Sequence, residues 1–238
     1  MKDHRGGSRA AKAALYEQFA RIGQALASPA RMELIDLLAQ AEQHVEQLSR
    51  QANLSVKNTS AHLRVLRAAR LVDSRREGKF VIYRLAGPDV GALARALIAV
   101  ARDRLAEVAQ ISNAFFHARD TLNPVGLGEL RRLMRRADVV LLDVRPGEEF
   151  AAGHLRGARN VPLARLRATL AELSPACEIV AYCRGPYCVL APDAVALLRR
   201  RGFHARRLDV GFPEARDAGF AVAVLPAASP SSPAVTPP

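Results

Sequence analysis

Apolar and polar residues alternate along the first half of the chain mainly with the period of an α-helix. Apolar residues recur at helical spacing from residue 13 to about residue 26, whereas the first dozen residues are expected to be loosely ordered. Ser28 followed by Pro29 predicts a helix start, because serine caps helices and proline fits their first turn. A short helix is expected over residues 44–52, and another after Ser55 as its cap. This half is therefore predicted to be rich in α-helix.

A strand pattern and a long helix complete this half. Strand-forming residues flank residues 77–79 within residues 73–85, which predicts a β-hairpin with those three residues at its tip. One helix is then expected over about residues 88–117, because apolar residues recur along it. These residues are Leu93, Leu97, Val100, Leu105 and Val108.

The pattern changes near residue 123. Continuous apolar runs over residues 139–145 and 178–183 are typical of strands buried on both faces. Helices are expected over residues 125–138 and over residues 192–202, which end in a capping glycine. Strands that alternate with helices indicate a parallel α/β sheet flanked by helices.

We therefore predict a two-domain chain of α+β and α/β type. The first domain covers residues 1–118 and the second covers residues 126–224. Residues 225–238 are rich in proline, serine and alanine and contain no aromatic or charged residue. Such a segment buries too little apolar surface to offset the entropy of ordering, so we expect a disordered tail.

Composition adds a bias in charge. Half of the 238 residues are hydrophobic, and 35 Lys and Arg against 23 Asp and Glu give a net charge of +12, which favours a polyanionic partner. No apolar run approaches the roughly 18 residues that span a bilayer, and the N-terminus lacks the apolar region of a secretion signal. Three cysteines are an odd and low number, as in proteins of a reducing cytoplasm.

Two short helices, a third helix and a basic hairpin form the pattern of a winged helix-turn-helix. Val56, Thr59, Leu63 and Leu66 share one face of the third helix and are expected to pack inward. Polar residues near the start of such a helix suit base edges and phosphates, and a basic hairpin suits the DNA backbone. The alternative for the hairpin is a solvated charged turn. The candidate DNA contacts are Lys57, Asn58, Ser60, His62, Arg64, Arg75, Arg76 and Lys79.

Residues 28–85 resemble the ArsR-type family of dimeric bacterial repressors. The match includes Ser60, His62, Leu63, Leu66 and the hairpin "REGKFVIYRL". It departs from the family at Arg70, where glycine is usual in the turn. The resemblance implies a double-stranded DNA operator as partner and a homodimer whose interface is formed by the N-terminal helix and the helix at 88–117.

Many members of that family sense metals through cysteines in the helix before the turn. That segment here, "HVEQLSRQ", has no cysteine, and His44 with Glu46 makes a poor site for a soft ion. Asp103 and His117 are too far apart in sequence to share a ligand face. We therefore expect no metal and no cofactor.

The second domain contains "AYCRGPYCVL", with Cys183 and Cys188 five positions apart. A metal clip, a disulfide and a single reactive thiolate are the alternatives, and no CxxC pair or Cys/His cluster favours the metal. Cys183 ends a predicted buried strand, and in open α/β sheets ligands bind beyond the carboxyl ends of strands. Backbone N–H groups of a tight loop that enters a helix attract anions and lower a thiol pKa. Arg184 adds positive charge, and Gly185 with Pro186 suits the turn.

Residues 126–224 resemble a rhodanese domain. The match rests on Cys183 at the loop start and on a set of earlier positions: Asp143, Arg145, Glu149, Phe150, Gly153, His154, Gly157, Ala158 and Asn160. The resemblance implies that Cys183 takes a sulfur atom as a persulfide from a donor such as thiosulfate or polysulfide. Residues 184–188 would form the cradle, and Asp143, Arg145 and His154 would support it structurally. The candidate catalytic loop is thus Cys183, Arg184, Gly185, Pro186, Tyr187 and Cys188.

The chain also departs from the rhodanese pattern. Cys188 stands where arginine is common, which weakens the case for an anionic donor such as thiosulfate. Pro186 replaces glycine, Arg156 replaces proline and Ala215 replaces tryptophan. Related phosphatases and arsenate reductases place arginine six positions after the cysteine, where this chain has Val189, so that chemistry is disfavoured.

The remaining cysteines have two interpretations. Cys188 is either a small buried residue at a helix start or a resolving thiol that attacks a persulfide on Cys183. Cys177 is expected to be structural or on the surface.

Three functions stay open from the sequence. The first is a DNA-binding regulator whose affinity for an operator responds to sulfane sulfur on Cys183. The second is a sulfurtransferase, acting on thiosulfate or mercaptopyruvate, with an attached DNA-binding domain. The third is a repressor with an inert rhodanese module.

Overall fold

The structure is a computed structural model, and it describes residues 4–114 and 124–225. The chain divides into two compact units, Met1–Gln110 and Ile111–Pro238. The predicted boundary at residues 118–126 and the predicted disordered tail fall largely outside the described residues, and both stay predictions. No helix in the described ranges is long and apolar enough to cross a membrane.

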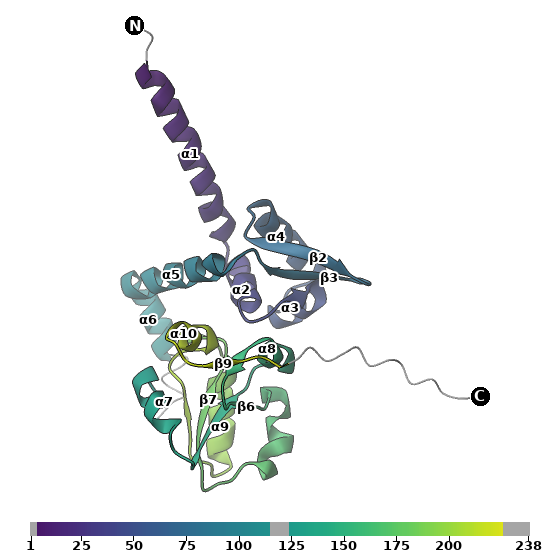
Figure 1. Ribbon diagram of the computed structural model, residues 1–238, viewed down its shortest axis with the longest axis vertical. Helices are drawn as coiled ribbons and strands as arrows, with labels where there is room; N and C mark the ends of the chain where they lie inside the picture. The colour runs from purple at the N-terminus through teal and green to yellow at the C-terminus, as the bar shows by residue number, and fades with distance from the viewer. Residues whose placement is uncertain (1–3, 115–123, 226–238) are drawn as a thin grey trace, which may run out of the picture. The chain divides into compact units, whose positions relative to one another are not determined.

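The first unit combines helices with a small antiparallel sheet (Figure 1). The sheet has the strand order β1-β3-β2, and β2 pairs with β3 residue by residue up to Glu77 and Phe80. The predicted hairpin is therefore present, with a two-residue turn in which Gly78 has a φ of 59°. The elements are α1 (His4–Leu26), α2 (Pro29–Leu38), β1 (Gln43–His44), α3 (Val45–Gln51), α4 (Val56–Ala68), β2 (Val72–Glu77), β3 (Phe80–Leu85), α5 (Pro88–Arg104) and α6 (Ala106–Ser112).

Two predictions about the helices of this unit are wrong. α1 begins at His4, so most of the first dozen residues are helical, which agrees with the high helix propensity of the alanine-rich sequence there. The helix predicted over residues 88–117 is two helices, because Leu105 adopts an extended conformation with a φ of −106° and a ψ of 108°. No glycine or proline marks this break, and residues 115–117 lie outside the described ranges.

The core of the first unit forms between α2, α3, α4 and the hairpin. Thr59, Leu63 and Leu66 are fully buried on one face of α4, as predicted. Val56 is 44% exposed, so the prediction that it packs inward is wrong. It is the first residue of α4 and lies outside the packed part of the helix face.

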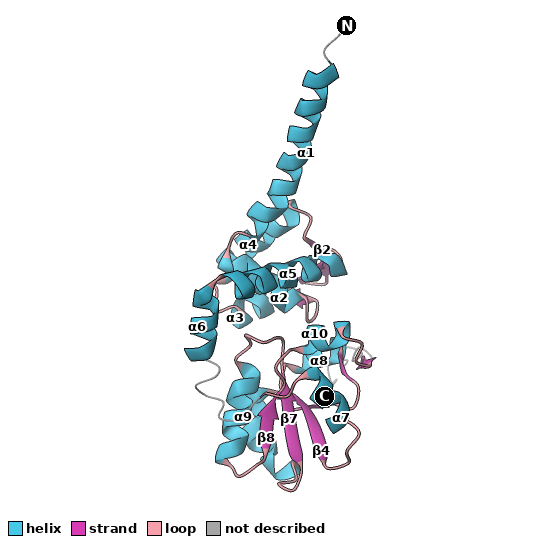
Figure 2. Cartoon of the chain, turned by 90° about the vertical axis from the view of Figure 1, so that its left-hand side faces the viewer, coloured by secondary structure: helices cyan, strands magenta, loops and turns pink. Residues whose placement is uncertain are grey.

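The second unit is built on a four-stranded parallel sheet (Figure 2). The strand order is β6-β4-β7-β8, and all three strand pairs are parallel, which confirms the predicted fold class. The elements are α7 (Leu127–Leu133), β4 (Val139–Asp143), α8 (Gly147–Ala152), β5 (His154–Leu155), β6 (Arg159–Asn160), the 3-10 helix η2 (Leu163–Glu172), β7 (Glu178–Tyr182), α9 (Leu190–Arg200), β8 (Ala205–Arg207), α10 (Phe212–Asp217) and β9 (Val222–Ala223). β5 and β9 form a separate antiparallel pair.

β7 is buried on both faces, as its continuous apolar run predicts. Ile179 and Ala181 face a core that includes α9 and η2, and Cys183 continues the same face. Val180 and Tyr182 face a second core that includes α7 and α10. Since successive side chains of a strand point to opposite faces, β7 fixes the side on which Cys183 lies.

Among the described residues, α3, α4, α9 and α10 end in the same left-handed cap, and the caps of α9 and α4 allow a comparison of glycine with arginine. At the end of α9, Gly202 has a φ of 83°, and the N–H groups of Gly202 and Phe203 donate to the carbonyls of Arg199 and Leu198. At the end of α4, Arg70 has a φ of 58° and the same pair of hydrogen bonds closes the turn. Both are Schellman motifs, whose left-handed residue is usually glycine. The glycine cap after α9 was predicted, whereas α9 begins at Leu190, two residues earlier than predicted.

Candidate functional site

The candidate site of the second unit is the loop between β7 and α9. Cys183 directly follows β7, and only 3% of its surface is exposed. Its carbonyl accepts a hydrogen bond of 3.0 Å from the N–H of Phe212, at the start of α10. Within the loop, the N–H of Cys188 donates to the carbonyl of Gly185 over 3.1 Å and closes a turn. These backbone bonds fold the loop back toward the cysteine that begins it.

The segment that precedes α10 packs directly on this loop. A Cβ atom added at Gly211 would overlap the backbone of Arg184 and the amide nitrogen of Gly185. The φ of Gly211 is −101°, which any residue can adopt, so the close approach and not the backbone conformation requires glycine here. Because Gly211 has no side chain, the backbone of the segment before α10 packs directly against the backbone of the loop.

Two sulfur atoms share the interior of the loop. The Sγ of Cys183 lies 3.6 Å from the carbonyl oxygen of Cys188 and 3.9 Å from that of Gly185. The Cys183 and Cys188 thiols also hydrogen bond to each other, and both cysteines are free. The sequence left open whether these side chains meet, and the structure brings them together.

The surroundings of the two thiols shift their pKa values in opposite directions. The hydrogen bond from Cys183, with backbone hydrogen bonds from Leu190 and Arg184, lowers the pKa of Cys188 to about 7 from its ordinary value of 9.0. Burial raises the pKa of Cys183 well above that value. The prediction that the loop lowers the pKa of Cys183 is therefore wrong: burial disfavours the charged form of Cys183, and the pair ionises more easily at Cys188.

Arg184 fixes the loop to α8. Its Nη2 lies 2.6 Å from one oxygen of Glu149, and its Nε lies 3.0 and 3.1 Å from the two carboxylate oxygens. Glu149 is 1% exposed, so the pair is largely shielded from water. The guanidinium is thus held by a carboxylate, and its charge contributes only the last of the effects that lower the pKa of Cys188.

A second buried pair supports the end of β4. The Nη2 of Arg145 lies 2.6 Å from Asp143 and 2.7 Å from the carbonyl of Gly153, and both charged side chains are fully buried. His154 is also buried, and its Nδ1 lies 2.8 Å from the carbonyl of Phe150, with the two rings stacked at 3.6 Å. These three side chains tie β4, α8 and β5 to one another.

The first unit presents a different kind of surface. Lys57, Asn58 and Arg64 are exposed on α4, and Ser60 and His62 are half-buried there. The hydroxyl of Ser55 accepts a hydrogen bond of 3.1 Å from the N–H of Asn58, so the predicted cap is present. Polar side chains near the start of α4 are therefore accessible from solvent, while the opposite face of the helix remains packed in the core.

The basic residues of the hairpin are also exposed to solvent. Arg75 pairs with Glu42 and lies 3.4 Å from Glu77, while Arg76 donates to the carbonyl of Gly78 over 3.3 Å. The Nζ of Lys79 lies 5.3 Å from the centre of the Phe80 ring. Exposed pairs of this kind contribute little to stability, because water and salt screen them.

Comparison with known proteins matches each unit to a family. Residues 28–74 match the bacterial regulatory protein, arsR family, and residues 127–218 match the rhodanese-like domain. The HTH-type transcriptional regulator Rv0324 of Mycobacterium tuberculosis is 44% identical over 211 residues, which cover 89% of this chain and 92% of that protein. The chain belongs to the ArsR family of transcriptional regulators and carries a rhodanese-like domain.

Further similar proteins cover the first unit of this regulator. Rv0081 of M. tuberculosis, an uncharacterized HTH-type transcriptional regulator, is 41% identical over 95 residues, which are 40% of this chain and 80% of that protein. The homodimeric winged helix-turn-helix domain of Mb0332 from Mycobacterium bovis aligns with a TM-score of 0.39 and 39% identity, over 44% of this chain and 92% of that one.

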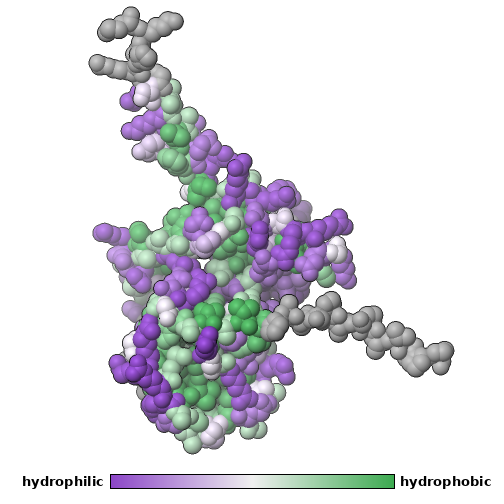
Figure 3. All heavy atoms as spheres, in the orientation of Figure 1, coloured by the Kyte–Doolittle hydropathy of each residue, from purple (hydrophilic) through white to green (hydrophobic). Residues whose placement is uncertain are grey.

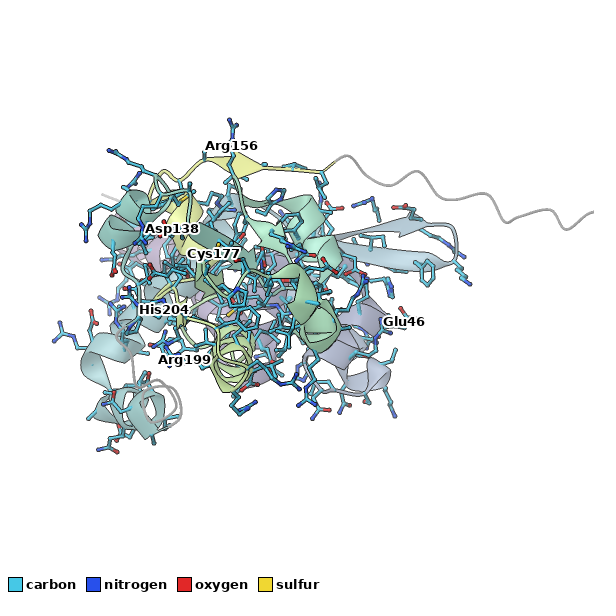
Figure 4. The ribbon with its side chains drawn as sticks, turned by 90° about the horizontal axis from the view of Figure 1, so that it is seen from below. Glu46, Asp138, Arg156, Cys177, Arg199 and His204 are labelled. Carbon is cyan, nitrogen blue, oxygen red and sulfur yellow. The ribbon has the colours of Figure 1, made fainter. Side chains whose placement is uncertain are left out.

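Other predicted positions of the regulator lie away from the loop. Cys177 is half-buried in the turn before β7, at the opposite end of that strand from Cys183, and Figure 4 labels it with Asp138. In the first unit, the Nδ1 of His44 lies 2.7 Å from Glu46, and no third ligand joins them. Across residues 4–114 and 124–225, no group of three or more His, Cys, Asp or Glu side chains could hold a metal ion.

Sequence reasoning missed two residues that position the loop. Glu149 was matched to the rhodanese pattern but not connected with Arg184, which lies 35 positions further along the chain. Gly211 carried no signal in the sequence, where no element was predicted around it. Gly185, Pro186 and Tyr187 are half-buried in the loop itself, between the two cysteines.

Proposed function

We propose that this regulator binds operator DNA as a homodimer and that sulfane sulfur, accepted on Cys183 as a persulfide, changes its affinity for that DNA. The observation that carries the proposal is the placement of Cys183. It lies at the carboxyl end of a central parallel strand, in a loop whose backbone hydrogen bonds surround the two sulfur atoms. The carboxyl end of a parallel strand is where ligands bind in open α/β sheets, and backbone N–H groups of a tight loop favour an anionic donor.

The cysteine pair provides a route to the nucleophile. The thiolate of Cys188 accepts the proton of the Cys183 thiol along their hydrogen bond, which leaves a thiolate on Cys183. This thiolate attacks the outer sulfur of a polysulfide, and the donor leaves with one sulfur fewer. The added sulfur remains on Cys183 as a persulfide within the loop.

DNA binding is assigned to α4 and the β2–β3 hairpin. Lys57, Asn58, Ser60, His62 and Arg64 would face the major groove, and Arg75, Arg76 and Lys79 would contact phosphates or the minor groove. Support comes from the exposure of the charged members of this set and from the family to which the chain belongs.

Exposed apolar residues support the homodimer. Leu15, Tyr16 and Phe19 gather on one face of α1 and are 56–62% exposed, and apolar positions along α1 are visible in Figure 3. Leu97 and Val100 lie on one face of α5 and are 47% and 62% exposed. Faces of this kind mark protein interfaces. We expect Val100→Glu to produce monomers in analytical ultracentrifugation, while the native chain sediments as a dimer.

The test of the function measures DNA affinity in the full chain. A duplex selected by the protein from a random-sequence pool is titrated with the native protein, Cys183→Ser and Cys177→Ser, each with and without inorganic polysulfide. We expect polysulfide to change the affinity of the native protein and of Cys177→Ser but not that of Cys183→Ser. Equal responses in all three proteins would disprove the role of Cys183.

The same loop also suits a second function, a sulfurtransferase with an attached DNA-binding unit. The observation that favours it is the support of the loop region by two buried ion pairs. These are Arg184 with Glu149 and Arg145 with Asp143. This function predicts turnover with thiosulfate or mercaptopyruvate that Cys183→Ser abolishes, together with a DNA affinity that no donor changes. The outcome of the DNA titration therefore distinguishes it from the regulator. An inert rhodanese module predicts that no donor adds sulfur to Cys183.

A further inference from the structure

Cys188 occupies a place in the loop that the transfer of sulfur to Cys183 does not by itself explain. It stands where an arginine would favour an anionic donor, yet it packs against the same hydrophobic cluster as Cys183, and its carbonyl oxygen lies 3.6 Å from the Sγ of Cys183. The turn closed by the Cys188 N–H and the Gly185 carbonyl holds it there. A residue that only filled space would not need a sulfur atom in contact with the nucleophile.

We propose that Cys188 is a second nucleophile, which attacks the persulfide on Cys183, forms a Cys183–Cys188 disulfide and releases hydrosulfide. The proposal rests on the proposed function, since it requires a persulfide on Cys183. It makes the loop a two-thiol centre that reduces sulfane sulfur rather than one that only stores it.

The step balances with the atoms in the loop. The Cys188 thiolate attacks the inner sulfur of the persulfide, which is the Sγ of Cys183. One sulfur–sulfur bond forms between the two cysteines, and the bond between Cys183 and the added sulfur breaks. The added sulfur leaves as hydrosulfide with its proton and the electron pair of the broken bond. Sulfane sulfur is reduced to sulfide, and the two thiols are oxidised to a disulfide, so no other oxidant is needed.

Geometry favours attack on the inner sulfur. The Sγ of Cys183 already lies 3.6 Å from the carbonyl oxygen of Cys188 in the resting loop, whereas the added sulfur extends beyond it. Cys183 is 3% exposed, so external thiols reach the persulfide poorly, while Cys188 is part of the same short loop. An intramolecular thiolate of this kind has a high effective concentration.

The charge state of the pair agrees with this role. With a pKa of about 7, Cys188 is substantially ionised near neutral pH, and the thiolate is the attacking form of a cysteine. The disulfide is reset by a small external thiol, which attacks Cys188, the more exposed of the two sulfurs.

The experiment treats the full-length protein with inorganic polysulfide, blocks free thiols with an alkylating reagent and measures the intact mass and the hydrosulfide released. The native protein is expected to lose two hydrogen atoms and to release one hydrosulfide per chain beyond that formed from the donor alone. Cys188→Ser is expected to gain one sulfur atom, more slowly because it lacks the proton acceptor for Cys183, and to release no hydrosulfide. Cys183→Ser is expected to show neither change, and Cys177→Ser to behave as the native protein.

Peptide mapping makes the test independent of how well any variant folds. Trypsin cuts after Arg184, between the two cysteines, so the disulfide joins peptide 168–184 to peptide 185–199 in a non-reducing digest of the native protein. Because Cys177 also lies in the first peptide, the same linked pair from Cys177→Ser assigns the bond to Cys183. Circular dichroism of Cys188→Ser and Cys188→Ala shows whether the loop variants are folded.

The outcomes separate this proposal from the proposed function. A native protein that keeps a persulfide on Cys183 as long as Cys188→Ser does would overturn the role of Cys188 and leave the role of Cys183 intact. A crosslink that retains the added sulfur would also overturn it, because no hydrosulfide has left. If the native protein acquires neither an added sulfur on Cys183 nor a Cys183–Cys188 disulfide, then the proposed function itself fails. If Cys183→Ser gains sulfur on Cys188, the order of the two nucleophiles proposed here is wrong.

Discussion

The first unit carries its candidate contacts on exposed side chains, whereas the second carries its candidate chemistry on buried sulfur atoms held by backbone. Lys57 and Arg64 stand on the surface of α4, with their positions set only by the helix beneath them. Cys183 and Cys188 lie in a loop fixed by Phe212, by the close approach of Gly211 and by the Arg184–Glu149 pair. Changes in the first surface should therefore affect binding alone, and changes around the loop should affect folding and chemistry together.

The largest effect is expected at the buried pair that supports the second unit. Asp143→Ala removes the carboxylate that pairs with Arg145 in a fully buried position, which we expect to cost about 3–5 kcal/mol of unfolding free energy. Urea unfolding measures it. The matched control, Asp103→Ala, breaks an ion pair whose side chains are about 60% exposed and should cost less than about 1 kcal/mol. Equal losses of unfolding free energy in the two variants would show that burial does not determine how much these ion pairs contribute to stability.

The next effect concerns the support beneath the loop. Gly211→Ala forces a methyl group into the backbone of Arg184 and Gly185, and we expect a loss of about 1–3 kcal/mol. Gly128→Ala in α7 has no neighbour within 4 Å and should instead stabilise the chain, by about 0.5–1 kcal/mol. Urea titrations of both variants provide the measurement, and a stable Gly211→Ala protein would contradict the close packing of the loop.

A change on the DNA-binding surface should leave stability unaltered. Lys57→Ala removes one exposed charge per subunit near the start of α4, and we expect weaker DNA binding together with a salt dependence that falls by about 0.9 in log–log slope per subunit, or about 1.8 for the dimer. The unfolding free energy should change by less than about 0.5 kcal/mol. Arg132→Ala, an exposed arginine on α7, serves as the control for net charge. An identical loss of affinity in both variants would assign the effect to overall charge and not to α4.

The turn after α4 offers a smaller effect of the opposite sign. Arg70 adopts a φ of 58°, a left-handed conformation that glycine adopts without strain. Arg70→Gly is expected to stabilise the chain by about 1 kcal/mol in thermal or urea unfolding. Gly202→Ala, in the same type of cap after α9, should destabilise by a similar amount. If the free energy of unfolding changes in the same direction in both variants, strain at the left-handed residue does not determine the stability of these caps.

The last prediction concerns pH and the cysteine pair. The rate of alkylation of Cys188 should rise as the pH increases through about 7, since the thiolate is the reactive form. Cys183→Ala removes the hydrogen bond that is the largest cause of the lowered pKa of Cys188, so the midpoint should move to higher pH. Peptide 185–199 contains Cys188 as its one cysteine and reports the rate by mass spectrometry. An unchanged midpoint would mean that the two thiols do not interact.

The sequence predicted the features that depend on neighbouring residues. The cap at Ser55, the turn at Gly78 and the buried strand that ends at Cys183 are all encoded within short segments, and the structure contains them. The features it missed join distant segments. Glu149 meets Arg184 across 35 positions, and Gly211 meets the loop only because α10 packs beside it. The break at Leu105 has no local signal in glycine or proline.

The central claim is that the sulfur state of Cys183 sets the affinity for DNA, and one titration tests it directly. A labelled duplex, selected by the protein, is held half-bound by the full-length native protein while polysulfide is added in steps and then removed by a reducing thiol. We expect the bound fraction to change in proportion to the sulfur or disulfide found at Cys183 by mass spectrometry. It should return to its starting value when the thiols are restored. A bound fraction that stays constant while Cys183 is fully modified would contradict it.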